Sequence, residues 1–548
     1  MRVDVARLRT PAFTIPAAIF FFALILRVLG IGWGLPDARR TDSLHPDEPV
    51  NILYSQRAIE PARLSFTPDF YNYGTLYLTA TRVASDVATT YGGKNARATL
   101  IGPRVLSTVA GSLCAAMIAG FFARRGKSVA AWTGGLATAV ANGLVVHSRF
   151  ATVDVLATAL LTGGLLLAMR AGDSAQPPRR LLGAATLIGL AAACKYNMAL
   201  GALGVIVAAM DLPRERRAGT IGLIVITIAV VFLLGVPGAL LQTESFVRDV
   251  RYELLHTATG HGLVFAGTPN GFLYHLSNLI LASGLLTVIL GVAGLVTATR
   301  AGERWAWVAL AFAIPYALLI GRAEVKFLRY VLPLVPILAL GLGAFVQRLY
   351  ETEGRRMLAV AVAILTIGGI DLGGLNATVR STVDMAGPDP RDIAGAYLRG
   401  AAGSGSVGLA TDPWFWTATI YPETASPRTV GASRYLGLMV AQTNPRVLRY
   451  LPENARERQD FDVRLLTEQR PDFVTMSSLD SGAARRFQDV DVSGDPEAQA
   501  LKTRYADFTR ELNAHYDLAR VFGPSRRPLV EDMEYVSPTV YVWKRRAN

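Results

Sequence analysis

The stretch LLGAATLIGLAAACKYNMALGALGVIVAAM, residues 181–210, is a long apolar run that is interrupted at its centre by Lys195 and Asn197. The charges that flank it, described below, favour a hairpin of two short helices that turns at Lys195. At ~1.5 Å per residue each arm is about 21 Å long, which is short for a bilayer. Lys195 is therefore expected to lie below the outer surface of a membrane.

Nine further apolar stretches near 20 residues long surround this run, and each is long enough to be a membrane span. The chain is 51% hydrophobic and only 18% charged, which is less charge than a soluble protein of 548 residues carries. These features predict an α-helical polytopic membrane protein. The first stretch is longer than a signal-peptide core and lacks a cleavage pattern, so we expect an uncleaved span there. The nine stretches are residues 12–33, 100–122, 128–146, 151–169, 219–241, 276–299, 305–321, 327–347 and 357–375.

Basic linkers indicate the orientation of the spans, because Lys and Arg concentrate in cytoplasmic loops. All of them lie inside, with the basic N-terminal tail, if 181–210 is a hairpin and residues 74–91 form a helix at the membrane surface. The prediction is eleven spans, with the N-terminus inside and the C-terminus outside. The net charge of +13 then belongs to cytoplasmic loops, and no nucleic-acid partner is expected. The linkers are residues 123–127, 170–180, 211–217, 299–304 and 347–356.

The chain changes in character after Leu375, where turns rich in Pro, Gly and Asp separate short apolar runs. We predict a transmembrane domain at 1–375 and a soluble α/β domain at 376–548, because about 170 residues suffice for one domain. Strands are expected at 405–411, 472–478 and 539–545, and helices at 391–401 and 498–517.

The predicted outer face receives most of the ionisable residues outside the basic linkers. It comprises two long loops (34–99 and 242–275), three turns (147–154, Lys195 and 321–330) and the soluble domain. Charged side chains that are far apart in the sequence are therefore expected to converge on one side of the membrane.

The segment DSLHPDEPVN, residues 42–51, places two adjacent carboxylates in the first outer loop. Asp47 and Glu48 suit general-base chemistry or cation binding. In an alternative reading Asp47 only caps a helix that starts at Glu48. His45 could join Asp47 on a metal, but one His and one Asp fall short of a metal-site signature.

Arg149 and Asp154 stand at the end of one predicted span and the start of the next. Ionisable groups at membrane depth are costly and usually face a partner or a cavity, so both are candidates for a functional site. The alternative is a structural Arg–Asp pair that holds the two helix ends together.

Basic residues gather on the same face. Lys326, Arg329 and Tyr330 precede an apolar run whose two prolines loosen the start of a helix. Each basic residue alone could anchor a membrane end, and Lys195 alone could extend to the interface. Together with Lys195 they form a cluster that calls for an anion, and a lipid-linked phosphate is the natural candidate.

His256 and His261 lie five residues apart in the second outer loop. A helical metal-binding pair has a spacing of four, so substrate contact or loop structure is the better interpretation. Further candidates for substrate contact are His45, Tyr71 and Tyr73.

Six motifs, taken in order along residues 10–375, resemble the membrane glycosyltransferases of the GT-C superfamily. The resemblance is to the group of dolichyl-phosphate-mannose–protein mannosyltransferases and aminoarabinose transferases, which is similar to glycosyltransferase family 39. No single motif is strong, but the ordered set is specific. The motifs are HPDE (45–48), YNYGTLYL (71–78), residues 102–127, HSRFATVD (147–154), CKYN (194–197) and RYVLPLVP (329–336).

The resemblance implies the GT-C fold and an inverting transfer from a polyprenyl-phosphate sugar on the periplasmic side. Asp47 matches the catalytic acid of the first loop, Glu48 its neighbour and Asp154 the second acidic position. The basic positions of the family are matched by Arg149, Lys195 and Arg329, the last followed by Tyr330. Two departures bear on donor and acceptor identity: HPDE replaces an aromatic–Asp–Glu sequence, and CKYN replaces Thr–Lys–Gly.

Residues and resemblance together predict a glycosyltransferase of the cytoplasmic membrane. The basic residues would hold the phosphate leaving group, and a carboxylate would deprotonate an acceptor hydroxyl on a glycan, lipid or protein. Because phosphate is a fair leaving group, no cofactor is required. Two alternatives stay open: a transporter or flippase of lipid-linked glycans, which needs no carboxylate beside the basic residues, and a metal-dependent oligosaccharide transferase.

Overall fold

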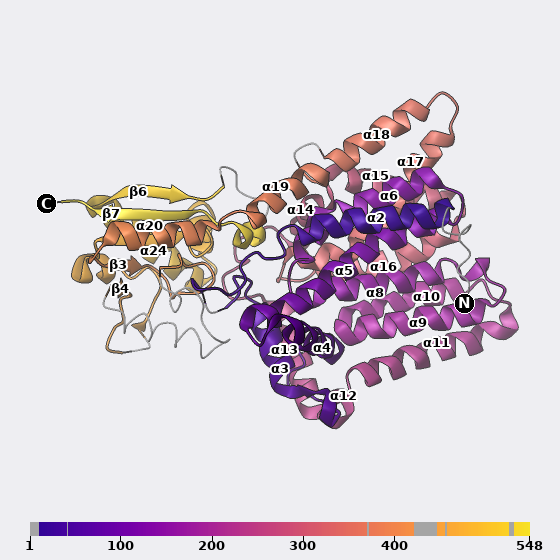
Figure 1. The fold of residues 1–548 in the computed structure, drawn as a ribbon, viewed down its shortest axis with the longest axis horizontal. Helices are drawn as coiled ribbons and strands as arrows, with labels where there is room; N and C mark the ends of the chain where they lie inside the picture. Colours follow the sequence, from indigo (N-terminus) through magenta and orange to yellow (C-terminus); the bar gives the residue numbers. More distant parts are fainter. Residues whose placement is uncertain are drawn as a thin grey trace.

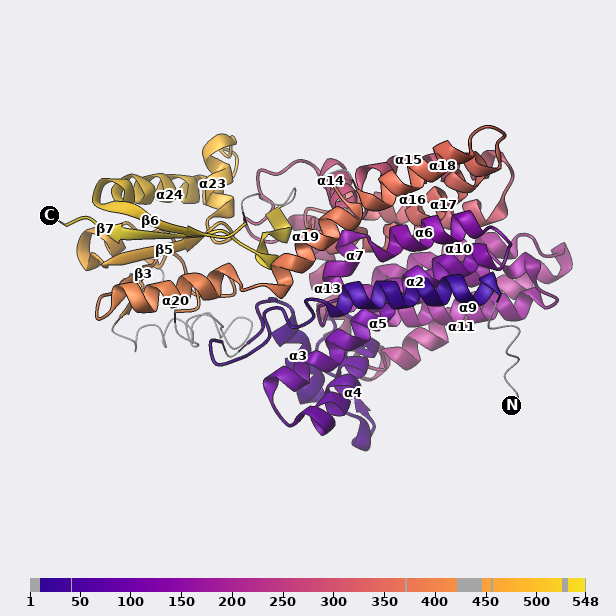
Figure 2. The same ribbon diagram turned by 45° about the horizontal axis from the view of Figure 1, so that its top comes forward.

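The computed structural model describes residues 10–40, 42–369, 372–420, 446–454, 457–524 and 531–547. A bundle of long helices forms one end of the molecule, and a sheet with helices on both faces forms the other (Figures 1 and 2). This arrangement confirms the predicted fold class, a polytopic helical protein with an α/β domain at its C-terminal end.

Apolar helices build the bundle. In the described part of the chain, five helices are long and apolar enough to cross a membrane, or six if the bent pair α14 and α15 counts as one span. Shorter apolar helices lie between them, so a multi-pass protein is confirmed while the number of eleven spans stays a prediction. The bundle consists of α2 (Pro11–Val28), α5 (Ala96–Ala123), α6 (Ser128–Ala139), α7 (Asn142–His147), α8 (Val153–Ala168), α9 (Pro177–Cys194), α10 (Gly201–Ala209), α11 (Arg214–Gly235), α14 (Gly271–Ser283), α15 (Leu285–Arg300), α16 (Arg304–Gly321), α17 (Val335–Glu351) and α18 (Arg356–Gly368).

The predicted hairpin at 181–210 is confirmed. Helix α9 ends at Cys194, Lys195 is extended, and a 3₁₀ turn, η3 (Tyr196–Leu200), leads into α10. The first outer loop meets this turn closely, because the N–H of Gly74 donates to the carbonyl of Cys194 at 2.9 Å. A Cβ at position 74 would lie 1.8 Å from the carbonyl oxygen of Ala193, so only glycine permits the contact.

The predicted span at 276–299 is not one continuous helix, and whether the two helices together form one span stays a prediction. Helices α14 and α15 meet at an angle of 103°, and the break falls at Gly284. Gly284 has φ +97°, a left-handed conformation that ends a helix and that glycine adopts without strain. The bend also brings Gly284 against Gly373, where a Cβ would lie 2.2 Å from the Cα of Gly284. An apolar run alone does not reveal a turn that two glycines make possible.

The two long loops that are predicted to lie outside fold mainly into helices beside the bundle (Figure 2). Residues 74–91 form a helix as predicted, α4, and it packs against α5. Its predicted place at a membrane surface stays a prediction. The loop elements are α3 (Glu48–Ala58), β1 (Ile59–Glu60), η1 (Pro61–Arg63), β2 (Ser65–Phe66), α4 (Thr75–Gly92), α12 (Gly238–Leu241) and α13 (Thr243–Thr259).

The C-terminal domain is a five-stranded sheet of order β4-β3-β5-β7-β6. Strand β3 pairs in parallel with β4 and β5, and β7 pairs antiparallel with both β5 and β6. Strands β3, β5 and β7 confirm the three predicted strands. One face is covered by α20 and the other by α23 and α24 (Figure 2). The elements are β3 (Val407–Leu409), β4 (Val447–Leu448), β5 (Phe473–Ser477), β6 (Tyr516–Phe522), β7 (Val540–Arg545), α20 (Pro390–Ala402), α23 (Gly482–Asp489) and α24 (Pro496–His515).

Both predicted helices of this domain are confirmed by α20 and α24, and each begins in the way its sequence dictates. Asp389 accepts a hydrogen bond from the N–H of Arg391, and Asp495 accepts from Glu497 and Ala498. A proline follows each aspartate at the first helical position, where its missing N–H costs nothing. Helix α19 (Gly374–Ala386) spans the predicted domain boundary at 375, which itself stays a prediction.

Candidate active site

Asp47 reaches a basic residue 282 positions away. Its carboxylate accepts a hydrogen bond of 2.7 Å from Arg329, which stands on η4 (Leu328–Leu334) at the start of the helix that continues into α17. Asp47 occupies the N-cap position of α3, as the alternative reading predicted, but its side chain accepts no hydrogen bond from the helix, so the carboxylate is not used for capping. Both side chains are partly exposed, 25% for Asp47 and 16% for Arg329.

Asp154 makes a second pair of the same kind. It lies in the first turn of α8, where the helix dipole favours a negative charge, and accepts a hydrogen bond of 2.7 Å from the Nζ of Lys195. The ammonium also lies 4.8 Å from the ring centroid of Tyr330, a cation–π distance. The tip of the hairpin is thereby tied to η4.

The two pairs form one cluster. Asp154 interacts electrostatically with Arg329 as well as with Lys195, and Arg329 in turn interacts with Asp47, Asp154 and Tyr330. We call Asp47, Arg329, Asp154, Lys195 and Tyr330 the paired-charge cluster. It collects side chains from the first outer loop, α8, the hairpin and η4, as the predicted convergence on one face required.

Glu48 lies in very different surroundings from its neighbour. Glu48 and Arg104 of α5 are both completely buried, and two hydrogen bonds of 2.8 and 2.7 Å join them. Glu48 also accepts from the N–H of Ala151 at 2.7 Å and from the hydroxyl of Ser43. Burial alone would raise the pKa of Glu48, but the charge of Arg104 and these hydrogen bonds lower the pKa below its ordinary value.

Two of the predicted phosphate-binding residues are engaged elsewhere. Arg149 does not pair with Asp154; it donates to the carbonyl of Leu26 at 2.7 Å and to the hydroxyl of Thr382 on α19 at 2.6 Å. Lys326 donates to the hydroxyl of Thr268 and the carbonyl of Pro269, and pairs with Glu324. Both basic side chains are buried and hold neighbouring segments of the chain together.

His45 lies directly behind Asp47. Its Nδ1 accepts a hydrogen bond of 3.2 Å from the backbone N–H of Asp47, and its buried ring lies 4.4 Å from that of Phe150. Tyr73 borders the paired-charge cluster, since it interacts electrostatically with Asp47 and Arg329. Tyr71 is further away, where its hydroxyl donates to Gln242 at 2.5 Å.

The second outer loop lies against the turn that carries Arg329. His256 and His261 contact one another at 3.0 Å between ring nitrogens, and the ring of His261 lies 5.7 Å from Phe327. The N–H of Glu324 donates to the carbonyl of Thr257, which fixes the loop to the turn. Within the described ranges, no group of three or more His, Cys, Asp or Glu side chains has an arrangement that could hold a metal ion.

Comparisons with known proteins show which proteins resemble this chain in sequence and in fold. A family model described as dolichyl-phosphate-mannose-protein mannosyltransferase matches residues 96–240, which include Asp154 and Lys195. The apo structure of ArnT from Cupriavidus metallidurans aligns with a TM-score of 0.52 and 16% identity over 96% of this chain and 97% of that chain. The chain has the GT-C fold of membrane glycosyltransferases.

Other comparisons agree on the fold. The archaeal oligosaccharyltransferase AglB from Archaeoglobus fulgidus, in complex with an inhibitory peptide and a dolichol-phosphate, aligns with a TM-score of 0.52. Identity is 10%, over 89% of this chain and 72% of that chain. No curated protein matches the chain in sequence. The predicted GT-C resemblance is confirmed, and the match to the mannosyltransferase model supports a glycosyltransferase activity.

Sequence reasoning missed several residues that surround this candidate site. Arg104 was not singled out, although an arginine inside an apolar helix signals a buried partner. The hydroxyl of Tyr196 lies 2.9 and 3.1 Å from the carbonyl oxygens of Tyr71 and Tyr73, and joins the hairpin to the first outer loop. Glu253 of α13 accepts a hydrogen bond of 2.7 Å from the side-chain amide of Asn72, and no spacing in the sequence predicts this contact.

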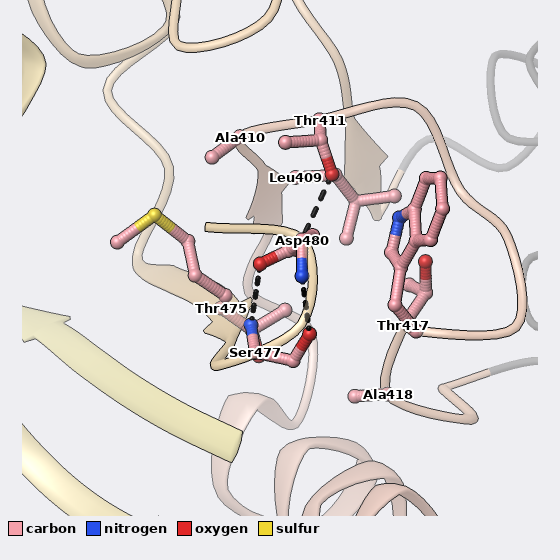
Figure 3. A pocket seen from close by; sticks show the side chains of 10 residues that line it. Leu409, Ala410, Thr411, Thr417, Ala418, Thr475, Ser477 and Asp480 are labelled. Carbon is pink, nitrogen blue, oxygen red and sulfur yellow. Dashed lines mark hydrogen bonds between the residues drawn. The ribbon is translucent and has the colours of Figure 1, made fainter. Parts of the chain in front are cut away.

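The C-terminal sheet domain carries a separate small hollow (Figure 3). It lies beyond the carboxyl ends of β3 and β5, and Asp480 accepts hydrogen bonds there from the N–H of Ser477 at 2.8 Å and the hydroxyl of Thr411 at 3.2 Å. Asp480 has no cation partner among the described residues, and burial raises its pKa to about 7. The polar side chains that line the hollow already have hydrogen-bond partners within the protein, so the paired-charge cluster is the better candidate for catalysis.

Proposed function

We propose that the protein is an inverting glycosyltransferase that moves a sugar from a polyprenyl-phosphate donor to an acceptor hydroxyl. The observation that carries this proposal is the paired-charge cluster, in which two carboxylates and two cations lie together at 2.7 Å contacts. Cations alone would suffice for binding a phosphate, whereas the carboxylates add a group that takes up a proton. Their combination is what a sugar transfer from a phosphate requires.

The donor phosphate binds to Lys195 and Arg329 in this proposal. Guanidinium and ammonium groups are the usual partners of phosphate, and their hydrogen bonds to it are charge-assisted. The ring of Tyr330 restricts water on one side of Lys195. Support for a lipid-linked phosphate comes from AglB, which has the same fold and whose structure contains a dolichol-phosphate.

The transfer is a single displacement. The acceptor oxygen forms a bond to the anomeric carbon from the face opposite the phosphate, and the bond from that carbon to the phosphate oxygen breaks. Its electron pair leaves with the polyprenyl phosphate, where Lys195 and Arg329 stabilise the charge. The proton of the acceptor hydroxyl passes to Asp47 as general base.

Asp47 becomes available when the donor binds. In the structure its Oδ2 accepts from Arg329. A phosphate that engages Arg329 competes with this bond, and the freed carboxylate oxygen can then accept the proton. The base would thus be released only when a donor is present. Asp154 keeps Lys195 in place, while Glu48, whose oxygens are occupied by Arg104 and Ala151, acts as framework.

We further propose that no divalent metal takes part, because phosphate is already a fair leaving group and Lys195 and Arg329 can donate charge-assisted hydrogen bonds to it. Product formation that persists with EDTA is expected, and its loss would favour the metal-dependent alternative. The site and the soluble domain are proposed to lie on the periplasmic side of the cytoplasmic membrane. Cysteine in place of Arg510, which is exposed on α24, should react with an impermeant maleimide in spheroplasts, and cysteine in place of Glu353 should not.

The decisive experiment compares two carboxylates of the first outer loop. A strain that lacks the protein is complemented with wild type, with Asp47→Asn, or with the control Asp69→Asn, whose side chain is 65% exposed. Mass spectrometry of envelope glycans and lipids then measures the product, and binding of undecaprenyl phosphate is measured on each purified protein. Asp47→Asn should remove the product and keep binding, and Asp69→Asn should change neither. Full product with Asp47→Asn would overturn the assignment and favour the transporter.

A further inference from the structure

A short segment of the soluble domain enters the helical bundle. Residues Glu531–Val536 form a 3₁₀ turn, η7, just before β7, and Figure 1 shows this part of the chain beside α19 between sheet and bundle. Met533, Tyr535 and Val536 are buried there and belong to the apolar core of the bundle, together with Trp33 and Phe150. The two domains therefore share a core at this point.

Polar contacts hold η7 in place from both sides. The indole N–H of Trp33 donates to the carbonyl of Val536 at 3.0 Å, and Arg391 of α20 donates to the carbonyl of Tyr535 at 2.9 Å. Nearby, Arg40 forms buried hydrogen bonds of 2.7–3.0 Å with Asp392. Because these groups are buried, moving η7 would leave them without partners, which makes the junction stiff.

The ring of Tyr535 reaches the first outer loop. It lies 5.3 Å from the ring of His45 in an edge-to-face arrangement, and 5.9 Å from the ring of Phe150. Phe150 also lies 4.4 Å from His45, so the imidazole is held between aromatic rings of two domains. His45 itself is completely buried.

His45 passes this constraint on to Asp47. Its Nδ1 accepts the backbone N–H of Asp47, a bond that requires a lone pair on Nδ1 and hence a neutral imidazole. Burial lowers the pKa of His45, so the neutral form is the one present near pH 7. The residue that carries the carboxylate is thus fixed by a ring that the soluble domain holds.

We propose that Tyr535 is a positioning residue of the transfer site. Its ring clamps His45 against Phe150, and His45 holds the backbone of Asp47 so that the carboxylate meets Arg329. The structural half of this inference stands on contacts alone, whereas its catalytic half rests on the proposed function. The soluble domain is then a part of the active site and more than an appendage to it.

Hydrogen exchange tests the structural half without any substrate. The full-length protein in detergent is compared as wild type, Tyr535→Leu and Tyr535→Phe, following the amides of residues 43–51 by mass spectrometry. Phe508→Leu is the matched control, because Phe508 is a fully buried ring on α24 whose apolar cluster contains no residue of η7. Tyr535→Leu should speed exchange at these amides about 10-fold, since the clamp is lost. The Phe variant and the control should exchange like wild type.

Equal exchange in Tyr535→Leu and wild type would overturn the inference, and so would equally fast exchange in Phe508→Leu. If Tyr535→Leu does not fold, Tyr535→Met, which fills the space without a ring, takes its place. The His45 link is tested by His45→Asn, whose Oδ1 can accept the same N–H, against His45→Phe, which cannot. Only the Phe variant should speed exchange at Asp47.

The catalytic half is read from product formation. Tyr535→Leu should lower kcat about 10-fold and leave KM for the donor unchanged, because a displaced base slows the chemical step while the phosphate site stays intact. Tyr535→Phe should restore the wild-type kcat. If Tyr535→Leu exchanges faster but has an unchanged kcat, the contact of Tyr535 with His45 is supported and the role of Asp47 as the base is overturned. Failure of the inference and failure of the proposed function therefore give different results.

Discussion

Asp47 and Glu48 are adjacent in the chain, and each pairs with an arginine more than 50 residues away, yet their carboxylates lie in opposite environments. Glu48 is completely buried, and its oxygens accept from Arg104, Ala151 and Ser43. Asp47 is one quarter exposed, and the side-chain hydrogen bond found for it is the one from Arg329. Consecutive residues before and at the start of a helix point in different directions, so Glu48 enters the bundle and Asp47 faces Arg329.

The difference teaches how to separate a structural carboxylate from a reactive one. A group whose acceptor positions are all occupied cannot take up a proton without breaking the packing around it. A group with free positions and access to solvent can exchange its partner for a substrate. The Glu48–Arg104 and Asp47–Arg329 pairs have the same chemistry and the same distance. They differ in the exposure of the carboxylate and in the number of hydrogen bonds that it can still accept.

The largest expected effect is on stability. Arg104→Gln leaves the carboxylate of Glu48 buried without its cation and should lower the free energy of unfolding by about 3–5 kcal/mol. Arg329→Gln removes the same charge from a partly exposed pair, where water replaces it, and should cost less than about 1 kcal/mol. Thermal unfolding of the purified proteins in detergent measures both. A similar loss of stability in the two variants would abolish the distinction between the pairs.

The next effect concerns a buried carboxylate that has no cation. Asp480 has a pKa of about 7 in the folded protein, above the ordinary value of 3.8. Between these values the folded state binds more protons than the unfolded state, so stability is greatest at low pH and falls as pH rises towards 7. Between pH 5 and 7 the loss should be about 2 kcal/mol. Glu48, whose pKa Arg104 lowers, contributes no such loss in this window.

Asp480→Asn provides the control for this pH effect, because an amide mimics the protonated carboxyl and keeps an acceptor for the N–H of Ser477. Unfolding midpoints at pH 5, 6, 7 and 8 should decline for wild type and stay level for the variant, apart from the background that all groups share. Parallel curves for the two proteins would mean that the carboxyl is ionised in the folded state despite its burial.

The sequence was informative where a charged residue interrupted an apolar pattern. Lys195 marked the turn of the hairpin, and of the two adjacent acids of the first loop Asp47 belongs to the paired-charge cluster. Partners were harder to predict: Arg149 pairs across to α19 rather than with Asp154, and Glu48 pairs with Arg104. Which cation a carboxylate meets depends on how helices pack, and no local spacing encodes it. The bend at Gly284 was missed for the same reason, since its contact with Gly373 is long-range.

The smallest effect sharpens the comparison among the basic residues. Lys195→Gln and Arg329→Gln should each weaken binding of undecaprenyl phosphate about 10-fold, the equivalent of ~1.4 kcal/mol, because each removes one charged donor from the proposed phosphate site. Lys326→Gln is the matched control, since that ammonium already bonds Thr268, Pro269 and Glu324. In a titration with undecaprenyl phosphate, the affinity of Lys326→Gln for this lipid should equal that of the wild type. A tenfold loss in Lys326→Gln as well would show that the site reaches beyond the paired-charge cluster to the second outer loop, and that a bonded lysine can still change partners for a phosphate.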